Sequence, residues 1–242
     1  MKLVGKMQGE DKAWVEWREK FSDLYDNANY SSSLQAWAMH SSHRLAEKAF
    51  GEDAHFERVL EIGAGTGEHL SFVRHRFDKY ILTDQDPKTL DVARKKLVGI
   101  HDGKLAFEQQ AGAILAYPDS SFDRLVATHV LEHIYPPHLA IKEWVRVLKD
   151  QAVLSIVIPT DPGLAWRLGR YLGPRKNALA RGIAYDYIMA REHVNSCINL
   201  IAILRHYFPE GKEAWWPLPV PLVDLNLFFA FQVKICKLES SQ

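Results

Sequence analysis

Short apolar runs alternate along this chain with segments whose apolar residues recur at helical spacing. Five runs have the length and composition of buried strands, and they lie at 57–62, 80–84, 104–108, 124–128 and 152–159. Two further strands are predicted near 213–216 and 226–236. Helical periodicity predicts helices at 67–76, 89–97, 138–148 and 194–207. This alternation is typical of an α/β fold.

Two more helices are predicted before the first strand. Trp14, Trp17 and Phe21 fall on one helical face. The serines at 31–33 offer N-caps for a second helix over 34–50.

A glycine-rich turn follows the first strand. Gly63, Gly65 and Gly67 occupy alternate positions, and Glu61 precedes them at the strand end. Glycine lets the main chain take unusual dihedral angles and lets a ligand approach it closely, although a glycine-rich segment can also be only a turn. Open α/β sheets bind nucleotides at such strand–turn–helix units. The acid would oppose a pyrophosphate but suits a cationic ligand.

A second acid ends the next strand. Asp84 lies 21 positions after Gly63, the spacing at which a carboxylate accepts the ribose hydroxyls of a bound nucleoside. The alternative is a solvated surface acid. Asp86 is the better candidate for the N-cap of the following helix, since Pro87 suits the first turn.

Composition narrows the class of protein. With 242 residues, 47% hydrophobic and 25% charged, the chain is expected to form one elaborated globular domain. Its formal net charge of zero argues against a general nucleic-acid surface. Cys197 and Cys236 lack metal-binding spacing, which fits free thiols in a reducing cytosol. We see no signal peptide and no apolar run long enough to span a membrane, so a cytoplasmic location is expected.

The segments 59–67 and 121–133 together resemble two motifs of the class I S-adenosylmethionine-dependent methyltransferases. The first reads Val-Leu-Glu-Ile-Gly-Ala-Gly-Thr-Gly, and the second contains Phe-Asp before a strand and His-Val-Leu-Glu-His after it. The resemblance implies a Rossmann-like, seven-stranded, mostly parallel sheet with an antiparallel last strand and helices on both faces. It divides one domain into an N-terminal helical cap (1–56), a cofactor-binding core (57–159), a substrate lid inserted after strand five (160–193), and a C-terminal helix with the last strands (194–242).

The cofactor implied by the resemblance is S-adenosylmethionine, with S-adenosylhomocysteine as product. Asp84 would hold the ribose and Gln85 would lie against the adenine. The other cofactor-binding residues implied are Glu61, Gly63, Ala64, Gly65, Gly67, Ala111, Gly112, Thr128 and His129. Ala111 departs from the family, which often has an aspartate there. The turn at 149–152 also lacks the family's usual glycines.

The reaction implied is methyl transfer to an oxygen or nitrogen of a small molecule. Candidates for the general base are His193, His129 and Glu132, in that order. Each also has a purely structural interpretation, and His193 is expected near a helix N-terminus, where its charged form is disfavoured. No cluster of carboxylates suggests a metal, so a metal-free mechanism is expected. A macromolecule methyltransferase and a non-catalytic binding protein of the same fold remain alternatives, although nucleic acid is not expected as a partner.

The segment 160–193 is rich in arginine interleaved with aromatic residues. Such a composition fits an anionic substrate, for example a nucleotide-linked or lipid-linked sugar. The stretch 164–182 also fits a basic amphipathic surface in contact with a membrane, or simply a solvated basic face. Residues expected to contact substrate are Tyr25, Tyr30, Trp37, Tyr185 and Arg191. The oligomeric state is left open.

Overall fold

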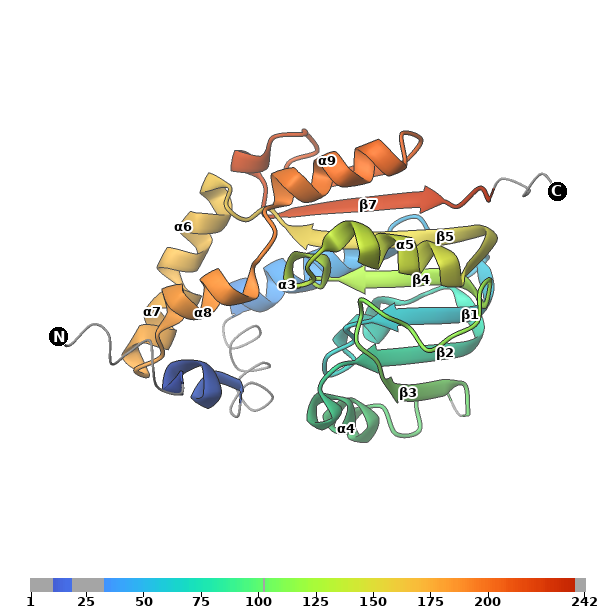
Figure 1. The fold of residues 1–242 in the computed structure, drawn as a ribbon, viewed down its shortest axis with the longest axis horizontal. Coiled ribbons are helices and arrows are strands. Elements are labelled where there is room, and N and C mark those ends of the chain that lie inside the picture. The colour runs from blue at the N-terminus through green and yellow to red at the C-terminus, as the bar shows by residue number, and fades with distance from the viewer. Residues whose placement is uncertain (1–10, 19–32, 102, 238–242) are drawn as a thin grey trace.

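A seven-stranded sheet forms the centre of the molecule (Figure 1). The computed structural model describes residues 11–18, 33–101 and 103–237. The strand order is β3-β2-β1-β4-β5-β7-β6. The strands are β1 His55–Ile62, β2 Arg76–Asp84, β3 Leu105–Gln109, β4 Phe122–Thr128, β5 Leu148–Pro159, β6 Lys212–Trp216 and β7 Phe228–Lys234. Because β7 runs antiparallel to both β5 and β6, the predicted mostly parallel sheet with a reversed last strand is confirmed.

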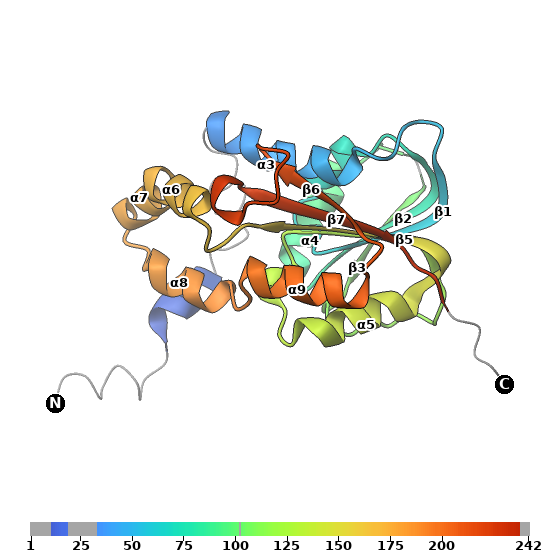
Figure 2. The ribbon, with the colours of Figure 1, turned by 90° about the horizontal axis from the view of Figure 1, so that it is seen from above.

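Helices cover both faces of this sheet (Figure 2). One face carries α3 and the opposite face carries α5 and α9, while α4 packs against β2 and β3. The helices are α3 Ser33–Glu47, α4 Pro87–Lys96, α5 Pro137–Val147, α6 Leu164–Leu172, α7 Pro174–Ala180, α8 Tyr185–Glu192 and α9 Cys197–Tyr207. Three short 3₁₀ turns are η1 Glu68–Phe72, η2 Leu131–His133 and η3 Val223–Leu225. The described residues therefore form the Rossmann-like arrangement expected from the motifs.

The segment between β5 and α9 forms α6, α7 and α8, which extend beyond the carboxyl edge of the central strands (Figure 1). A short helix over residues 12–18 lies beside α8. Arg191 of α8 pairs with Asp11 at 2.6 Å and lies 3.9 Å over the ring of Trp14. The chain before the sheet and the segment after β5 are therefore in direct contact.

The helix predicted over 67–76 is wrong in both type and length. The structure has the five-residue turn η1 there, and β2 begins at Arg76 instead of at residue 80. His69 and Leu70 of this turn are both buried, so the turn packs against the interior of the protein. Too few residues remain before β2 for a longer helix to form.

A buried ion pair joins α3 to the middle of the sheet. Arg124 of β4 is fully buried, although the apolar residues 125–127 follow it directly in the strand. Its guanidinium donates two hydrogen bonds to the carboxylate of Glu47, at 2.9 and 2.6 Å. The same guanidinium lies 4.2 Å over the ring of Phe50. This pair fixes the last turn of α3 against the sheet.

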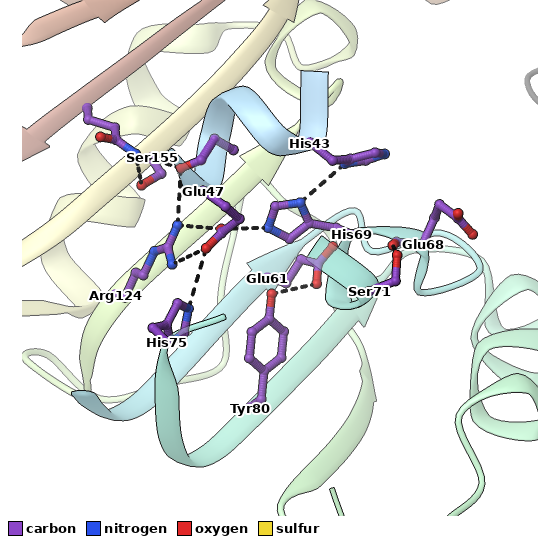
Figure 3. Close-up of polar contacts among 12 residues, drawn as sticks. His43, Glu47, Glu61, Glu68, His69, Ser71, His75, Tyr80, Arg124 and Ser155 are labelled. Carbon is purple, nitrogen blue, oxygen red and sulfur yellow. Dashed lines mark hydrogen bonds and ion pairs between the residues drawn. The ribbon is translucent and has the colours of Figure 1, made fainter. Parts of the chain in front are cut away.

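The pair continues toward the glycine turn through a histidine (Figure 3). The Nε2 atom of His69 lies 3.0 Å from Oε1 of Glu47. Burial alone would raise the pKa of Glu47, but the charge of Arg124 and the hydrogen bond from His69 lower it to about 2. Glu47 is therefore ionised at neutral pH, and both Arg124 and His69 donate to it, while Nε2 of His75 lies 3.7 Å from its Oε2.

We expect removal of one charge to cost far more stability than removal of both. Arg124→Met should lower the free energy of unfolding by roughly 3–5 kcal/mol, because the Glu47 carboxylate is left buried without its counter-charge. The double variant Arg124→Met/Glu47→Leu should recover more than half of that loss. Chemical denaturation monitored by circular dichroism measures both changes, and a double variant no more stable than the single one would contradict this account.

Candidate active site

The glycine turn after β1 requires glycine at two positions for a packing reason as well as a conformational one. Gly63, Gly65 and Gly67 all have positive φ, at 66°, 55° and 78°. A Cβ on Gly63 would lie 2.4 Å from Cγ2 of Val130, and one on Gly67 would lie 2.7 Å from Cδ1 of Leu97. The turn therefore presents backbone, without side chains, to the space beside it.

A small pocket lies beside this turn. Its walls come from α3, the end of β1, the glycine turn, η1 and the end of β4. The lining residues are Met39, His43, Glu61, Gly63, Ala64, Thr66, Glu68, His69, Thr128 and His129. Five of the predicted cofactor residues are among them, which are Glu61, Gly63, Ala64, Thr128 and His129.

Glu61 is fully buried at the pocket, and only one of its two carboxylate oxygens has a hydrogen-bond donor among the described residues. The hydroxyl of Tyr80 donates to Oε2 at 2.8 Å, while no described residue donates to Oε1. Burial raises the pKa of Glu61, and the charge of His69 and the bond from Tyr80 offset this only in part. A cationic ligand group beside Oε1 would remove that imbalance.

Asp84 ends β2 and contacts the glycine turn. Its Oδ2 accepts a hydrogen bond from the backbone N–H of Gly65 at 3.0 Å, and its Oδ1 accepts one from Asp86 at 2.9 Å. Burial raises the pKa of Asp84 despite these bonds. As predicted, Asp86 caps α4, accepting from the N–H of Lys88. The side chain of Gln85 is exposed, and its carbonyl accepts from Gln109.

The structure does not bring Ala111 and Gly112 to this pocket. Ala111 forms a β-bridge with Ile114. Gly112 accepts a hydrogen bond from the indole of Trp144 at 2.7 Å, and a Cβ there would lie within 2.9 Å of Ile62 and Ile134. Packing alone explains this glycine.

His129 joins the end of β4 to α3. Its φ of 60° is unusual for a residue other than glycine. Its N–H donates to the carbonyl of Val157, and its Nε2 lies 2.8 Å from Oγ of Ser42. Burial lowers the pKa of His129 to about 3, so its imidazole is neutral at physiological pH. Because its Nε2 is already in contact with Ser42 and its pKa is low, His129 is a poor candidate for the general base.

Five residues of the pocket were not among the predicted cofactor residues, and Thr66 and Glu68 beside the glycine turn are two of these. Met39 and His43 come from α3, and His69 comes from η1. The Nδ1 atoms of the two histidines lie 3.2 Å apart, and burial followed by the charge of His69 lowers the pKa of His43. The spacing of Met39, His43 and Glu47, four residues apart on one helical face, was the available signal.

A second polar group lies at the same edge of the sheet. Glu132, His133 and His193 each place one potential ligand atom within 4.8 Å of the others. Nδ1 of His193 lies 2.8 Å from Oδ2 of Asp161. Burial opposes ionisation of that aspartate, but the hydrogen bond and charge of His193, together with the charge of Arg170, lower its pKa.

Glu132 connects this group to the pocket. Its Oε1 lies 3.8 Å from Nε2 of His133 and 3.9 Å from Nδ1 of His129. Its Oε2 is buried and has no hydrogen-bond partner among the described residues. Burial raises the pKa of Glu132 to about 7.

The other predicted catalytic and substrate residues that the structure describes do not line the pocket. His193 follows the C-terminal end of α8, so the expected position at a helix N-terminus is wrong. Trp37 is exposed and packs edge-on against Trp216, with ring centroids 4.8 Å apart. Tyr185 is buried beneath Arg170, and Arg191 is paired with Asp11. Tyr25 and Tyr30 lie outside the described residues.

Comparison with known proteins agrees with this geometry. Residues 60–156 match the family described as methyltransferase domain. The demethylmenaquinone methyltransferase of Clavibacter sepedonicus is 27% identical over 203 residues, covering 81% of this chain and 74% of that protein. A chloroplastic 2-methyl-6-phytyl-1,4-hydroquinone methyltransferase of Oryza sativa subsp. japonica is 34% identical over 110 residues, covering 45% of this chain but only 32% of that protein.

Solved structures agree in fold. A putative S-adenosylmethionine-dependent methyltransferase from Methanococcus maripaludis superimposes with a TM-score of 0.58 at 11% identity, covering 92% of this chain and 93% of that one. The sheet order and the glycine turn beside a buried acid define a Rossmann-like methyltransferase domain. Residues 60–156 of this chain therefore carry a methyltransferase domain, and S-adenosylmethionine is the methyl donor that such a domain implies.

We expect Asp84→Ala to weaken binding of S-adenosylhomocysteine by about tenfold or more, because a charged acceptor for the ribose hydroxyls is lost. Asp86→Ala is the matched control. It should lower thermal stability through loss of the α4 cap while leaving affinity within about twofold. Isothermal titration calorimetry measures both affinities. Equal affinity in Asp84→Ala and the parent protein would remove Asp84 from the cofactor site.

Proposed function

We propose that the chain transfers the methyl group of S-adenosylmethionine to a small acceptor that carries aromatic hydroxyl groups, of the hydroquinone type. The observation that carries this proposal is the link between the cofactor pocket and a second polar group. His129 lines the pocket and also lies 3.9 Å from Glu132, which belongs with His133 and His193.

The residues of the pocket fit the cofactor. Oε1 of Glu61 is buried and has no described donor, so it can accept from the ammonium of the methionine part. The bare backbone at Gly63 leaves room for close approach, and Asp84 stands beside Gly65 to accept from the ribose. Bound there, the cofactor supplies an activated methyl group on a sulfonium.

The protein's own contribution is mainly placement. Methyl transfer is an in-line displacement, and holding two reactants in line can supply roughly 7–11 kcal/mol of the barrier. Nδ1 of His193 is bonded to Asp161, so the lone pair on its Nε2 is available to the hydroxyl of an acceptor. Such a contact orients the acceptor and takes up its hydrogen.

An uncharged aromatic acceptor suits the described residues better than the anionic sugar considered above. Three of the arginines in 160–193 are already paired with acids. These pairs are Arg170 with Asp161, Arg175 with Asp186 and Arg191 with Asp11. The two curated relatives described above are named for a menaquinone precursor and a hydroquinone, which supports an acceptor of this kind.

The acceptor is proposed to be taken from a membrane surface. None of the residues of α6 is buried, and Leu164, Leu168 and Leu172 fall on one exposed face. Exposed Leu222 and Leu225 belong to the segment next to it, which is tied to α6 by the bond from the N–H of Leu164 to Asp224. Exposed Arg167 and Lys176 flank this apolar surface, as in helices that lie on anionic bilayers. No helix within the described ranges has the length and apolar character needed to cross a membrane.

We expect methylated product from a hydroquinone with an isoprenoid chain and none from nucleotide sugars. His193→Ala should reduce turnover by about a hundredfold or more while cofactor affinity is retained, because the acceptor loses its hydrogen-bond partner. His206→Ala, at an exposed histidine of α9, is the matched control and should keep full activity. Mass spectrometry of the products and calorimetry with S-adenosylhomocysteine check these results.

Two outcomes would overturn the acceptor assignment. Methylation of a protein or nucleic acid at a higher rate than any small molecule would favour a macromolecular substrate. Tight cofactor binding with no product from any acceptor class would favour a binding protein that keeps the fold.

We expect Leu168→Glu/Leu172→Glu to weaken binding to vesicles of anionic phospholipid by about tenfold. These side chains are 53% and 82% exposed, so the fold should be unaffected and only the apolar contact with lipid should be lost. Ile114→Glu is the matched control, since that side chain is 77% exposed and belongs to the connection between β3 and β4. Co-sedimentation measures binding, and equal sedimentation of all three proteins would refute the membrane contact.

A further inference from the structure

Two segments that are distant in sequence bring three potential metal ligands together. Glu132 and His133 belong to η2, just after β4, and His193 follows α8. One ligand atom of each lies within 4.8 Å of the others. Two imidazoles and one carboxylate form a common ligand set for divalent transition metals.

The surroundings of the two histidines leave the same ring atom available in both. Nδ1 of His133 lies 2.8 Å from the carbonyl oxygen of Glu192, and Nδ1 of His193 lies 2.8 Å from the Asp161 carboxylate. Because these oxygens accept hydrogen bonds, each Nδ1 carries the hydrogen. Each Nε2 then keeps its lone pair. Histidines that ligate metals are almost always oriented in this way by an oxygen acceptor on the other ring nitrogen.

The carboxylate supplies an independent observation. Glu132 is only 3% exposed, and no described residue donates a hydrogen bond to its Oε2. Buried carboxylates are normally satisfied by donors or by cations. The nearby His133 Nε2, at 3.8 Å from Oε1, is too far to serve as a donor. The side chain is thus held in the interior without the partner that its charge requires.

We propose that Glu132, His133 and His193 bind a divalent transition-metal cation, with Zn²⁺ or Mn²⁺ as suitable occupants. Three protein ligands leave positions open for water or for an oxygen of another molecule. Ligand atoms around such an ion lie about 3 Å apart, so the three side chains would draw together by about 1 Å on binding. This proposal differs from the metal-free mechanism expected from the sequence. The ligand set was not visible there, because His193 lies 60 positions after His133 along the chain.

The position of this site indicates that the cation would contact the methyl acceptor. Glu132 is the neighbour of His129, which lines the cofactor pocket, so an open coordination position would face the region proposed for the acceptor. A bound cation would take the Nε2 lone pair of His193. The cation itself, in place of that nitrogen, would then hold the acceptor oxygen and favour loss of its hydrogen. Cation binding itself needs neither cofactor nor acceptor, so it can be tested apart from methyl transfer.

The test uses tag-free protein dialysed against a chelator and then titrated with Zn²⁺ or Mn²⁺ in a calorimeter. We expect one saturable site of micromolar or tighter affinity and much weaker binding of Mg²⁺, which prefers oxygen ligands. Glu132→Gln and His193→Ala should each weaken Zn²⁺ affinity by at least tenfold. His138→Ala, at an exposed histidine of α5, is the matched control and should bind as the parent does.

Glu132→Gln also shows whether a loss of Zn²⁺ binding is caused by misfolding. The variant should fold normally, because glutamine has nearly the same shape as glutamate and carries no charge. The metal-free variant should melt at or above the temperature of the parent, and only the parent should gain stability when Zn²⁺ is added. Absence of saturable binding, or affinity unchanged in the Glu132→Gln/His193→Ala double variant, would overturn the metal site. Normal Zn²⁺ affinity with no methyl transfer would instead count against the proposed function alone.

Discussion

The ion pair between Glu47 and Arg124 is the constraint on which the shape of the pocket depends. It holds the end of α3 against β4, and His69 extends it to the turn that follows the glycines (Figure 3). His43, one turn earlier on α3, then reaches the same histidine. A charged pair in the interior is costly to bury, so it contributes position more than stability. One wall of the pocket is therefore set by a contact made at a distance from it.

Parallel strands explain why the polar groups meet at one edge. Glu61 and Asp84 come at or near the ends of β1 and β2, while His129 and Asp161 follow β4 and β5. Neighbouring parallel strands place their carboxyl ends side by side, so residues far apart in sequence share one surface. Because β7 is antiparallel to β5 and β6, the loop over residues 217–227 that joins β6 to β7 also lies at this edge, beside Pro159. The parallel sheet thus brings these polar side chains to one edge, and the turn after each strand sets their orientation.

The features that could be predicted from the sequence are those that depend only on residues close together in the chain. The strands, the glycine turn and the placement of Asp84 follow from runs, spacing and residue type over short stretches. The 3₁₀ turn η1 was missed because the burial of His69 depends on Glu47, 22 residues away. Likewise, the pairing of Arg191 with Asp11 spans 180 positions, and no periodicity reports it. The grouping of Glu132 with His193 was hidden for the same reason.

The shortness of η1 has a consequence for ligand selectivity. Dinucleotide-binding sheets direct the first turn of a full helix at a pyrophosphate, whose negative charge the aligned peptide dipoles stabilise. Five residues of 3₁₀ turn provide little of that field. With Glu61 also buried at the strand end, this turn is a less favourable place for a pyrophosphate than the start of a full helix would be. The short turn therefore favours adenosine-containing molecules that lack a pyrophosphate over those that carry one.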